Sequence, residues 1–294
     1  MVQTQRYVSN ELSHFVGKGK TEEEQYDILV NKILKTGWLT YPPHDIVRPR
    51  SLALDMSQPI SDDKALKYEV VCFCDIPEAD LPIHVSKYSR FGLSFAKSFL
   101  IGRGACPVFY VANESPTSAT EILPPGDFMV EQVNAARARG VIDRALYFSI
   151  SVRQLLDIFA ALDAISSEES QRFFKGGDKL PSTETKKRLG QLLGLSDAQI
   201  TALERGLKGN VQANKTIANL RNFLINEVFS FVKCFDTTRA FDDEANYYME
   251  REWRIPNHLN FRLDDVSRVF LPAAYARRFR ADLPEYVAQI SFID

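Results

Sequence analysis

Strand-like segments stand at both ends of this chain, and a long helical block separates them. They are short apolar runs between turn residues, at 6–17, 68–75, 91–95, 107–112, 247–255, 266–271 and 287–292. The middle of the chain, about 128–233, repeats apolar residues at helical spacing instead. Because no regular βαβ alternation is visible, this order predicts an α+β fold with a large helical insertion.

Length and composition favour one elaborated domain over 1–294, with the insertion at 128–233 inside it. Hydrophobic residues make up 45% of the 294 residues, which is enough to bury a core. No stretch approaches the ~20 apolar residues of a membrane span, and the first ten residues lack the apolar centre of a secretory signal. We therefore expect a cytoplasmic protein that has no membrane partner.

The first helix carries its own start and stop signals. Thr21 is a residue type that caps helices, and Glu24 three residues later completes the sequence pattern of a capping box. An apolar stripe at helical spacing follows, and Gly37 stands where many helices end in a left-handed residue. These signals predict a helix between Thr21 and Gly37.

The cysteines point away from both disulfides and metal. Four cysteines in a chain of this length do not make a disulfide framework. Cys72 and Cys74 are separated by one residue instead of the two to four of a zinc knuckle, and no Cys/His cluster completes a site. Their apolar neighbours predict inert thiols buried in a strand. We expect no metal site.

Recognition of phosphate or nucleic acid has little support in the overall sequence. Neither GxGxxG nor GxxxxGK[ST] occurs, so any NAD binding would not use a Rossmann fold. The formal net charge of −2 gives no general attraction to nucleic acid, which leaves only local basic clusters at 186–188 and 277–280. Segment 188–209 resembles a helix-turn-helix, but its second helix would begin with Ser196 and Asp197, which favours an ordinary helical hairpin.

The segment at 248–254 carries the candidate chemistry. If it is one continuous strand, alternation places Tyr248, Glu250, Glu252 and Arg254 on the same face. One interpretation is a solvated strand face with paired charges. The other is the wall of a cleft, because strands disfavour glutamate and two glutamates stand here beside Tyr248 and Trp253.

Five short motifs carry a resemblance to known families. They are HF at 14–15, KTGWL at 35–39, CFCDIP at 72–77, YSRFG at 88–92 and EREWR at 250–254. Together they resemble ADP-ribosyltransferases of the His-Tyr-Glu type, and more closely the abortive-infection family AbiGi, which is labelled an antitoxin. They are also similar to the mRNA-modifying ADP-ribosyltransferase toxin (CmdT type) of bacterial toxin–antitoxin–chaperone phage defence. The resemblance covers about 1–112 and 240–256.

The resemblance implies an ADP-ribosyltransferase-like split β core that takes NAD as its substrate and needs no metal. Cleavage of the nicotinamide–ribose bond passes through an oxocarbenium-like state, which a nearby carboxylate stabilises. By resemblance Glu252 takes this catalytic role, and Glu250 would contact or deprotonate the acceptor. The implied cofactor-binding residues are His14, Phe15, Tyr88, Arg90 and Phe91.

Each of the three polar cofactor-binding residues also has a structural interpretation. His14 would bond the adenosine-side ribose, or would be a capping or core histidine. Tyr88 would stack on nicotinamide, or would only pack. Arg90 would pair with the pyrophosphate, or would be a solvated surface residue.

Two functions follow from these interpretations. The favoured one is an NAD-dependent ADP-ribosyltransferase toxin of anti-phage defence that modifies RNA, with a cognate antitoxin and a chaperone as further partners. The alternative is a non-enzymatic antitoxin or interaction protein of an abortive-infection system, and a protein-modifying transferase is the rival for the acceptor. The presence of both glutamates, His14 and Tyr88 favours the enzyme.

Overall fold

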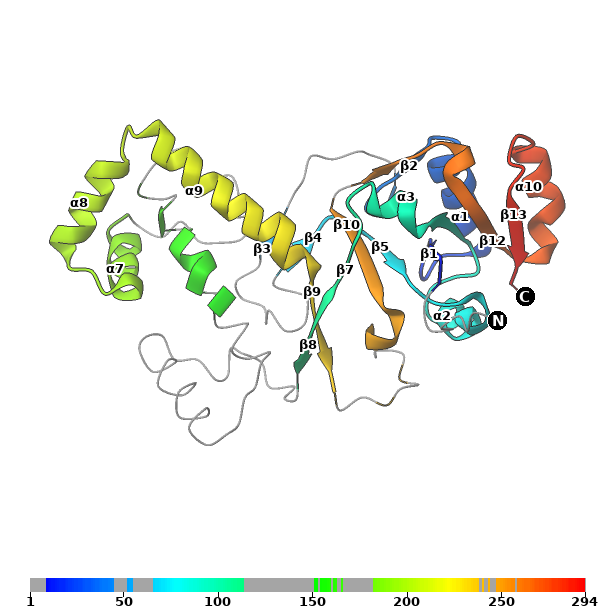
Figure 1. Cartoon of the computed structure of the whole chain (residues 1–294), viewed down its shortest axis with the longest axis horizontal. Coiled ribbons are helices and arrows are strands. Elements are labelled where there is room, and N and C mark those ends of the chain that lie inside the picture. Colours follow the sequence, from blue (N-terminus) through cyan, green and yellow to red (C-terminus); the bar gives the residue numbers. More distant parts are fainter. Residues whose placement is uncertain are drawn as a thin grey trace, which may run out of the picture. The chain divides into compact units, whose positions relative to one another are not determined.

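The computed structural model of the chain describes residues 9–44, 52–54, 66–113, 151–152, 154–159, 161–162, 165, 182–237, 240, 243, 247–256 and 258–293. The chain divides into two compact units (Figure 1). Unit 1 comprises Met1–Ser51, Glu69–Phe109 and Ala240–Asp294, and unit 2 comprises Leu52–Tyr68 and Tyr110–Arg239. Distant parts of the sequence therefore build unit 1 together.

A seven-stranded sheet forms the centre of unit 1, with the strand order β13-β12-β6-β1-β5-β10-β7. In chain order its strands are β1 (Glu11–Phe15), β5 (Val70–Cys74), β6 (Gly92–Ala96), β7 (Cys106–Pro107), β10 (Glu252–Pro256), β12 (Val266–Leu271) and β13 (Gln289–Phe292). The β12–β13 pair is parallel, and the other neighbours are antiparallel. A separate pair joins β2 (Trp38–Leu39) to β11 (Leu259–Asn260).

The structure confirms the start and stop signals predicted for the first helix. α1 (Glu22–Asp27) begins at the Thr21 cap, where the Glu24 carboxylate accepts a hydrogen bond from the Thr21 backbone N–H at 2.9 Å. The chain continues as a π-helical segment, Ile28–Leu34, which the sequence pattern does not distinguish from an α-helix. Gly37 has φ +69° and ends the helical region as predicted.

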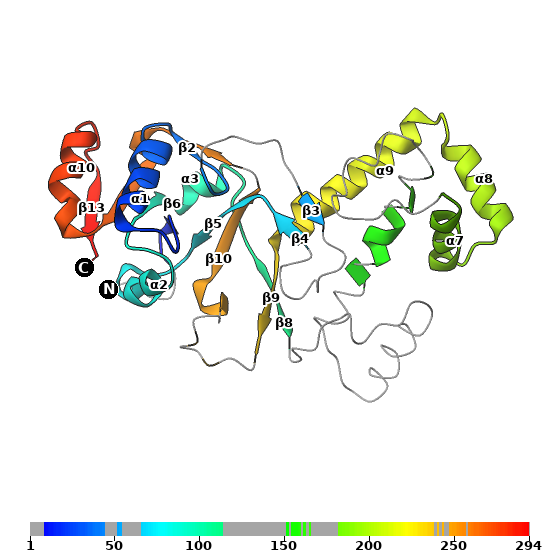
Figure 2. The same cartoon turned by 180° about the vertical axis from the view of Figure 1, so that it is seen from behind.

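The helices of unit 1 cover both faces of the sheet, as Figure 2 shows from behind. Residues of α1, the π-helical segment, α3 (Lys97–Ile101) and α10 (Ala276–Asp282) pack in the main core. On the other face, α2 (Leu81–Lys87) packs over Phe15 and Phe270. Gly92 lies between those two rings, and a Cβ there would meet Phe15 at 2.8 Å, so only glycine fits without a shift.

Unit 2 contains three consecutive helices: α7 (Ser182–Leu193), α8 (Asp197–Leu207) and α9 (Val211–Phe223). Ser196 caps α8 with a capping box to Gln199, and apolar residues such as Leu189 and Ile200 hold the hairpin together. Two short sheets pair β3 (Leu52–Leu54) with β4 (Leu66–Tyr68), and β8 (Phe109–Asn113) with β9 (Val232–Asp236).

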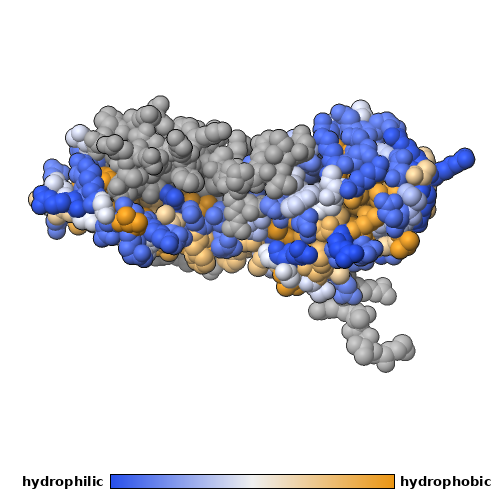
Figure 3. Space-filling view, turned by 90° about the horizontal axis from the view of Figure 1, so that it is seen from above, coloured by the Kyte–Doolittle hydropathy of each residue, from blue (hydrophilic) through white to orange (hydrophobic). Residues whose placement is uncertain are grey.

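The mixture of helices and sheets confirms the predicted α+β class. The helical insertion at 128–233 stays a prediction as a whole, since 128–150 and most of 160–181 lie outside the described residues. Among the helices that the structure describes, none has the length and apolar composition to cross a membrane. On the face of unit 1 that Figure 3 shows, hydrophilic residues cover one part of the surface and hydrophobic residues gather beside them.

Candidate functional site

The segment that carries both predicted catalytic carboxylates is not one continuous strand. Tyr247–Glu250 forms a 3-10 turn, Arg251 has φ +45°, and β10 begins only at Glu252. Tyr248 is 47% exposed, whereas Glu250 is 5% exposed. The predicted alternation from residue 247 onward is therefore wrong, because side chains alternate only while the backbone stays extended.

Glu252 forms a buried ion pair with Arg254. Its Oε1 lies 2.6 Å from the Arg254 Nε, and both side chains are about 95% buried. The two residues stand two positions apart on β10, so they share a face of the sheet, as predicted for this pair. β10 lies between β5 and β7, which makes Glu252 part of the sheet interior.

Glu250 is bonded to Tyr88, 162 residues away in the sequence. The Tyr88 hydroxyl donates to the Glu250 Oε1 at 2.8 Å, and the Glu250 carbonyl accepts from the Asp75 N–H at 3.2 Å. The Tyr88 ring stacks on His84 with 4.5 Å between centroids. The structure therefore brings together two residues that the resemblance placed in one site, and it ties the end of α2 to the turn before β10.

The two cysteines of β5 differ in their surroundings. Leu81 and Val85 of α2 pack around Cys74, and its Sγ donates to the Ser13 carbonyl at 3.4 Å. Burial and the nearby charge of Glu250 raise the pKa of the Cys74 thiol, so it stays protonated. Cys72 is exposed, which corrects the prediction that both thiols are buried. Among the described residues no His, Cys, Asp and Glu side chains gather as a metal site.

His14 and Glu252 point to opposite faces of the sheet. Ser13, Cys74 and Glu252 are direct partners on neighbouring strands, so their side chains share one face. His14 follows Ser13 and therefore points to the other face. Its ring lies edge-on to Phe73, the residue before Cys74. The sheet thus separates two residues that the sequence analysis combined into one site.

His14 is partly exposed and is held through one ring nitrogen, while its Nε2 is buried with no hydrogen-bond partner among the described residues. Its Nδ1 lies 2.7 Å from the Cys72 carbonyl oxygen, which can only accept, so Nδ1 carries the proton. Burial lowers the pKa of His14 and favours the neutral ring. The ring of His44 lies 5.9 Å away, edge to face.

Replacing His14 by glutamine should make the free energy of unfolding fall less steeply as the pH is lowered. The folded pKa of His14 lies below its usual value, so the unfolded chain binds the proton first as the pH falls. The contribution of His14 to the free energy of unfolding is fully present above about pH 6.5. At lower pH it decreases by at most about 1.4 kcal/mol per pH unit. Urea unfolding at pH 7.5 and 5.5 measures the slope, and His258→Gln controls for the loss of one histidine. Equal slopes for His14→Gln and the wild type would contradict this.

The aromatic residues of the predicted cofactor site lie in the hydrophobic interior. Phe91 is fully buried and meets the ring of Tyr26. Phe15 packs against Phe270 with 5.4 Å between ring centroids. Arg90 forms an ion pair with Glu22 at the start of α1. Each has a structural partner within unit 1.

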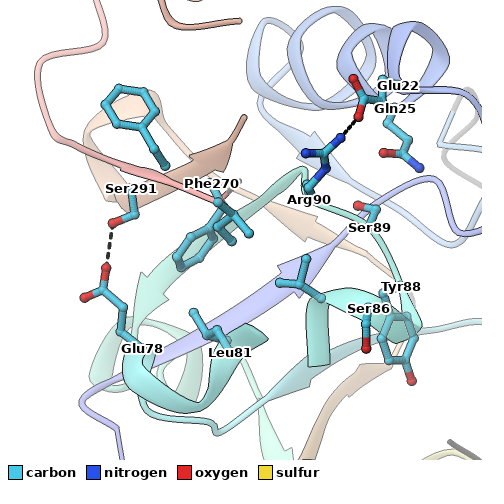
Figure 4. Close-up of a pocket in the computed structure, with 13 residues that line it drawn as sticks. Glu22, Gln25, Glu78, Leu81, Ser86, Tyr88, Ser89, Arg90, Phe270 and Ser291 are labelled. Carbon is cyan, nitrogen blue, oxygen red and sulfur yellow. Dashed lines mark hydrogen bonds and ion pairs between the residues drawn. The ribbon is translucent and has the colours of Figure 1, made fainter. Parts of the chain in front are cut away.

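Tyr88 and Arg90 also line a pocket of about 650 Å³ in unit 1 (Figure 4). Its volume lies in the range of about 300–1,000 Å³ typical of ligand pockets. Leu81, Val85 and Phe270 supply apolar surface, and further polar and apolar liners come from α1, the end of α2 and the C-terminal strand. The pocket was not predicted, because its walls are five segments that only the fold assembles.

Three of the six residues in the two basic clusters proposed for RNA make ion pairs or backbone contacts. Lys186 pairs with Glu204 at 2.7 Å. In the second cluster Arg278 pairs with Glu23 at 2.6 Å, and Arg280 donates to the Tyr286 carbonyl. These contacts reduce the positive charge available to phosphates, and RNA binding stays a prediction.

One family model matches most of the chain, over residues 63–279. It is described as "Putative abortive phage resistance protein AbiGi, antitoxin". The chain belongs to the AbiGi family. No curated protein and no solved structure matches it. The resemblance to AbiGi is thereby confirmed, together with an abortive-infection setting.

The AbiGi description corrects the favoured function. A toxin that transfers ADP-ribose from NAD to RNA is wrong as the main interpretation, because the family is described as an antitoxin. The matched range includes Tyr88, Arg90, Glu250 and Glu252 but not His14. Within the fold Glu250 is bonded to Tyr88 and Glu252 to Arg254, and a catalytic role for either glutamate stays a prediction.

Proposed function

We propose that this AbiGi chain is the antitoxin of an abortive-infection system and neutralises a toxin protein by binding it. The family match over 63–279 carries this proposal. It includes the Glu69–Phe109 segment and most of the C-terminal segment of unit 1, together with most of unit 2, so the proposal concerns the greater part of the chain.

The contacts of the predicted catalytic residues support a binding protein. Glu252 is held by Arg254 at 2.6 Å, and Glu250 by Tyr88 at 2.8 Å. Burial of a carboxylate with a partner of this kind is accounted for within the fold and does not require a substrate. His14 faces the other side of the sheet, so these three residues do not surround one reacting atom.

Unit 2 offers apolar side chains of the kind that protein partners cover. Leu220 and Phe223 of α9 are 52% and 56% exposed. Three residues apart on a helix, they lie on the same face. Large exposed apolar side chains grouped in this way favour contact with another protein over contact with a nucleic acid backbone.

NAD binding, an RNA partner, a chaperone and an ADP-ribosyltransferase-like core stay predictions on which this proposal does not depend. A protein antitoxin needs only a toxin partner and a stable fold. The proposal is therefore tested through growth and through complex formation.

The test is expression in bacteria, alone and together with each protein encoded beside this chain in its genome. Alone, the chain should leave colony counts unchanged. One neighbour should arrest growth when expressed alone, and co-expression of this chain should restore colony counts at least a hundredfold. Growth arrest by this chain alone, or a toxic neighbour that it does not rescue, would overturn the proposal.

A further inference from the structure

The pocket of unit 1 carries hydrogen-bond acceptors that the fold leaves unused. Gln25 is 8% exposed and lines the pocket from α1. Its Nε2 donates to the carbonyls of Gly17 at 3.2 Å and Lys20 at 2.9 Å. Because two carbonyl oxygens require a donor, they fix the orientation of the amide. The Oε1 atom is left as an acceptor at the pocket wall, on the side of Arg90 (Figure 4).

Two carboxylates at the pocket, those of Glu22 and Glu78, each have one oxygen atom that forms no hydrogen bond with the described residues. Glu22 uses its Oε1 for Arg90, and Glu78 uses its Oε1 for Ser291 and Arg268. Within the described residues, the Oε2 atoms of Glu22 and Glu78 have no hydrogen bond. Glu22 pairs with Arg90, and Arg268 bridges Glu78 and Glu11, so three carboxylates stand against two guanidiniums at this wall. This balance favours a cationic ligand.

The floor of the pocket is apolar. Leu81 is 3% exposed, Val85 is 7% exposed and Phe270 is 2% exposed, and all three belong to one buried cluster beneath the polar rim. A ligand with an aliphatic stem and a charged head matches such a surface, because the stem covers the floor while the head stays at the rim.

We propose that this pocket binds an arginine side chain of the toxin partner. Its guanidinium would donate to Gln25 Oε1 and to the free oxygens of Glu22 or Glu78, and its stem would lie over Val85 and Phe270. The α1 wall already holds one guanidinium, that of Arg90, which shows the fit of this group to Glu22. This proposal rests on the antitoxin function, for which the pocket would be the point where this chain contacts the toxin.

The first test uses a small probe and does not need the toxin. Methyl resonances of the whole chain are followed by NMR during titration with N-acetyl-arginine N-methylamide, and with the citrulline analogue, which has nearly the same shape but no charge. The arginine amide should shift methyl signals of Leu81, Val85 and Ile293, with an affinity at least fivefold above that of citrulline. Equal affinity for the two probes, or shifts confined to other residues, would overturn the pocket proposal.

Two variants and two matched controls extend the test to the toxin complex. Ser86→Trp, at an exposed position of α2, should fill the pocket, whereas Ser98→Trp on α3 places the same side chain elsewhere on unit 1. Glu78→Gln removes a liner charge, and Glu285→Gln removes an exposed charge that does not line the pocket. The pocket variants should each lower toxin affinity at least tenfold, and the controls less than twofold.

The outcomes separate the two proposals. If the wild type binds and neutralises the toxin but both pocket variants do so equally well, the pocket proposal fails and the antitoxin function stands. If no toxin binds the wild type, the antitoxin function fails, and the comparison of arginine with citrulline still decides whether the pocket takes a guanidinium.

Discussion

Replacing Arg254 by methionine should lower the free energy of unfolding by about 3–5 kcal/mol. The substitution keeps much of the side-chain volume but leaves the Glu252 carboxylate buried, charged and without the guanidinium that lies 2.6 Å from it. Breaking one side of a buried ion pair costs this much because the remaining charge has lost its hydration without compensation. Urea unfolding at pH 7.5 measures the loss.

The matched control is the double variant Glu252→Gln, Arg254→Met. It removes both charges together, so it should recover at least half of the stability that Arg254→Met loses. A loss below about 1 kcal/mol for Arg254→Met, or a double variant that is less stable than the single one, would contradict a structural role for the pair.

Phe91→Ala should lower the free energy of unfolding by about 3–5 kcal/mol and leave toxin affinity unchanged at temperatures where the variant is folded. Phe91 is fully buried and contacts Tyr26 and Tyr275, so its removal opens a cavity in the main core. Differential scanning calorimetry and toxin binding of the folded variant give the two quantities.

Phe109→Ala is the control for the second prediction. Phe109 is 66% exposed, so the same truncation should change stability by at most about 0.5 kcal/mol. If Phe91→Ala is as mild as Phe109→Ala, the core assignment of Phe91 is wrong. If the folded Phe91→Ala protein loses toxin binding, Phe91 contributes to function beyond packing.

Local signals in the sequence predict local structure well in this chain. The Thr21 cap, the end at Gly37 and the strand at 266–271 all appear where the pattern places them. Each depends on residues close together in the sequence, such as a capping side chain or a run of alternating apolar residues. Tyr247–Glu250 is the exception, because the turn at Arg251 depends on contacts made elsewhere, including the bond from Tyr88 to Glu250.

Which residues of the candidate site share a face of the sheet depends on how the strands pair, and the sequence of one strand does not reveal its pairing. That His14 and Glu252 face opposite sides follows only from the register of β1, β5 and β10. The resemblance placed Tyr88 and Glu250 in one site, but it did not predict the hydrogen bond between them. The pocket was missed because Gln25, Val85 and Phe270 come from three segments with no shared motif.

The most direct test of the antitoxin account is a titration of purified toxin with this chain. Toxin activity should fall linearly to near zero at a fixed molar ratio of the two proteins. Light scattering on the complex, as it elutes from a size-exclusion column, should give the mass expected for toxin and antitoxin combined at that ratio. NAD added to the mixture should change neither the ratio nor the end point. The antitoxin function would be contradicted if toxin activity persisted at a tenfold excess of this chain and no complex eluted from the column.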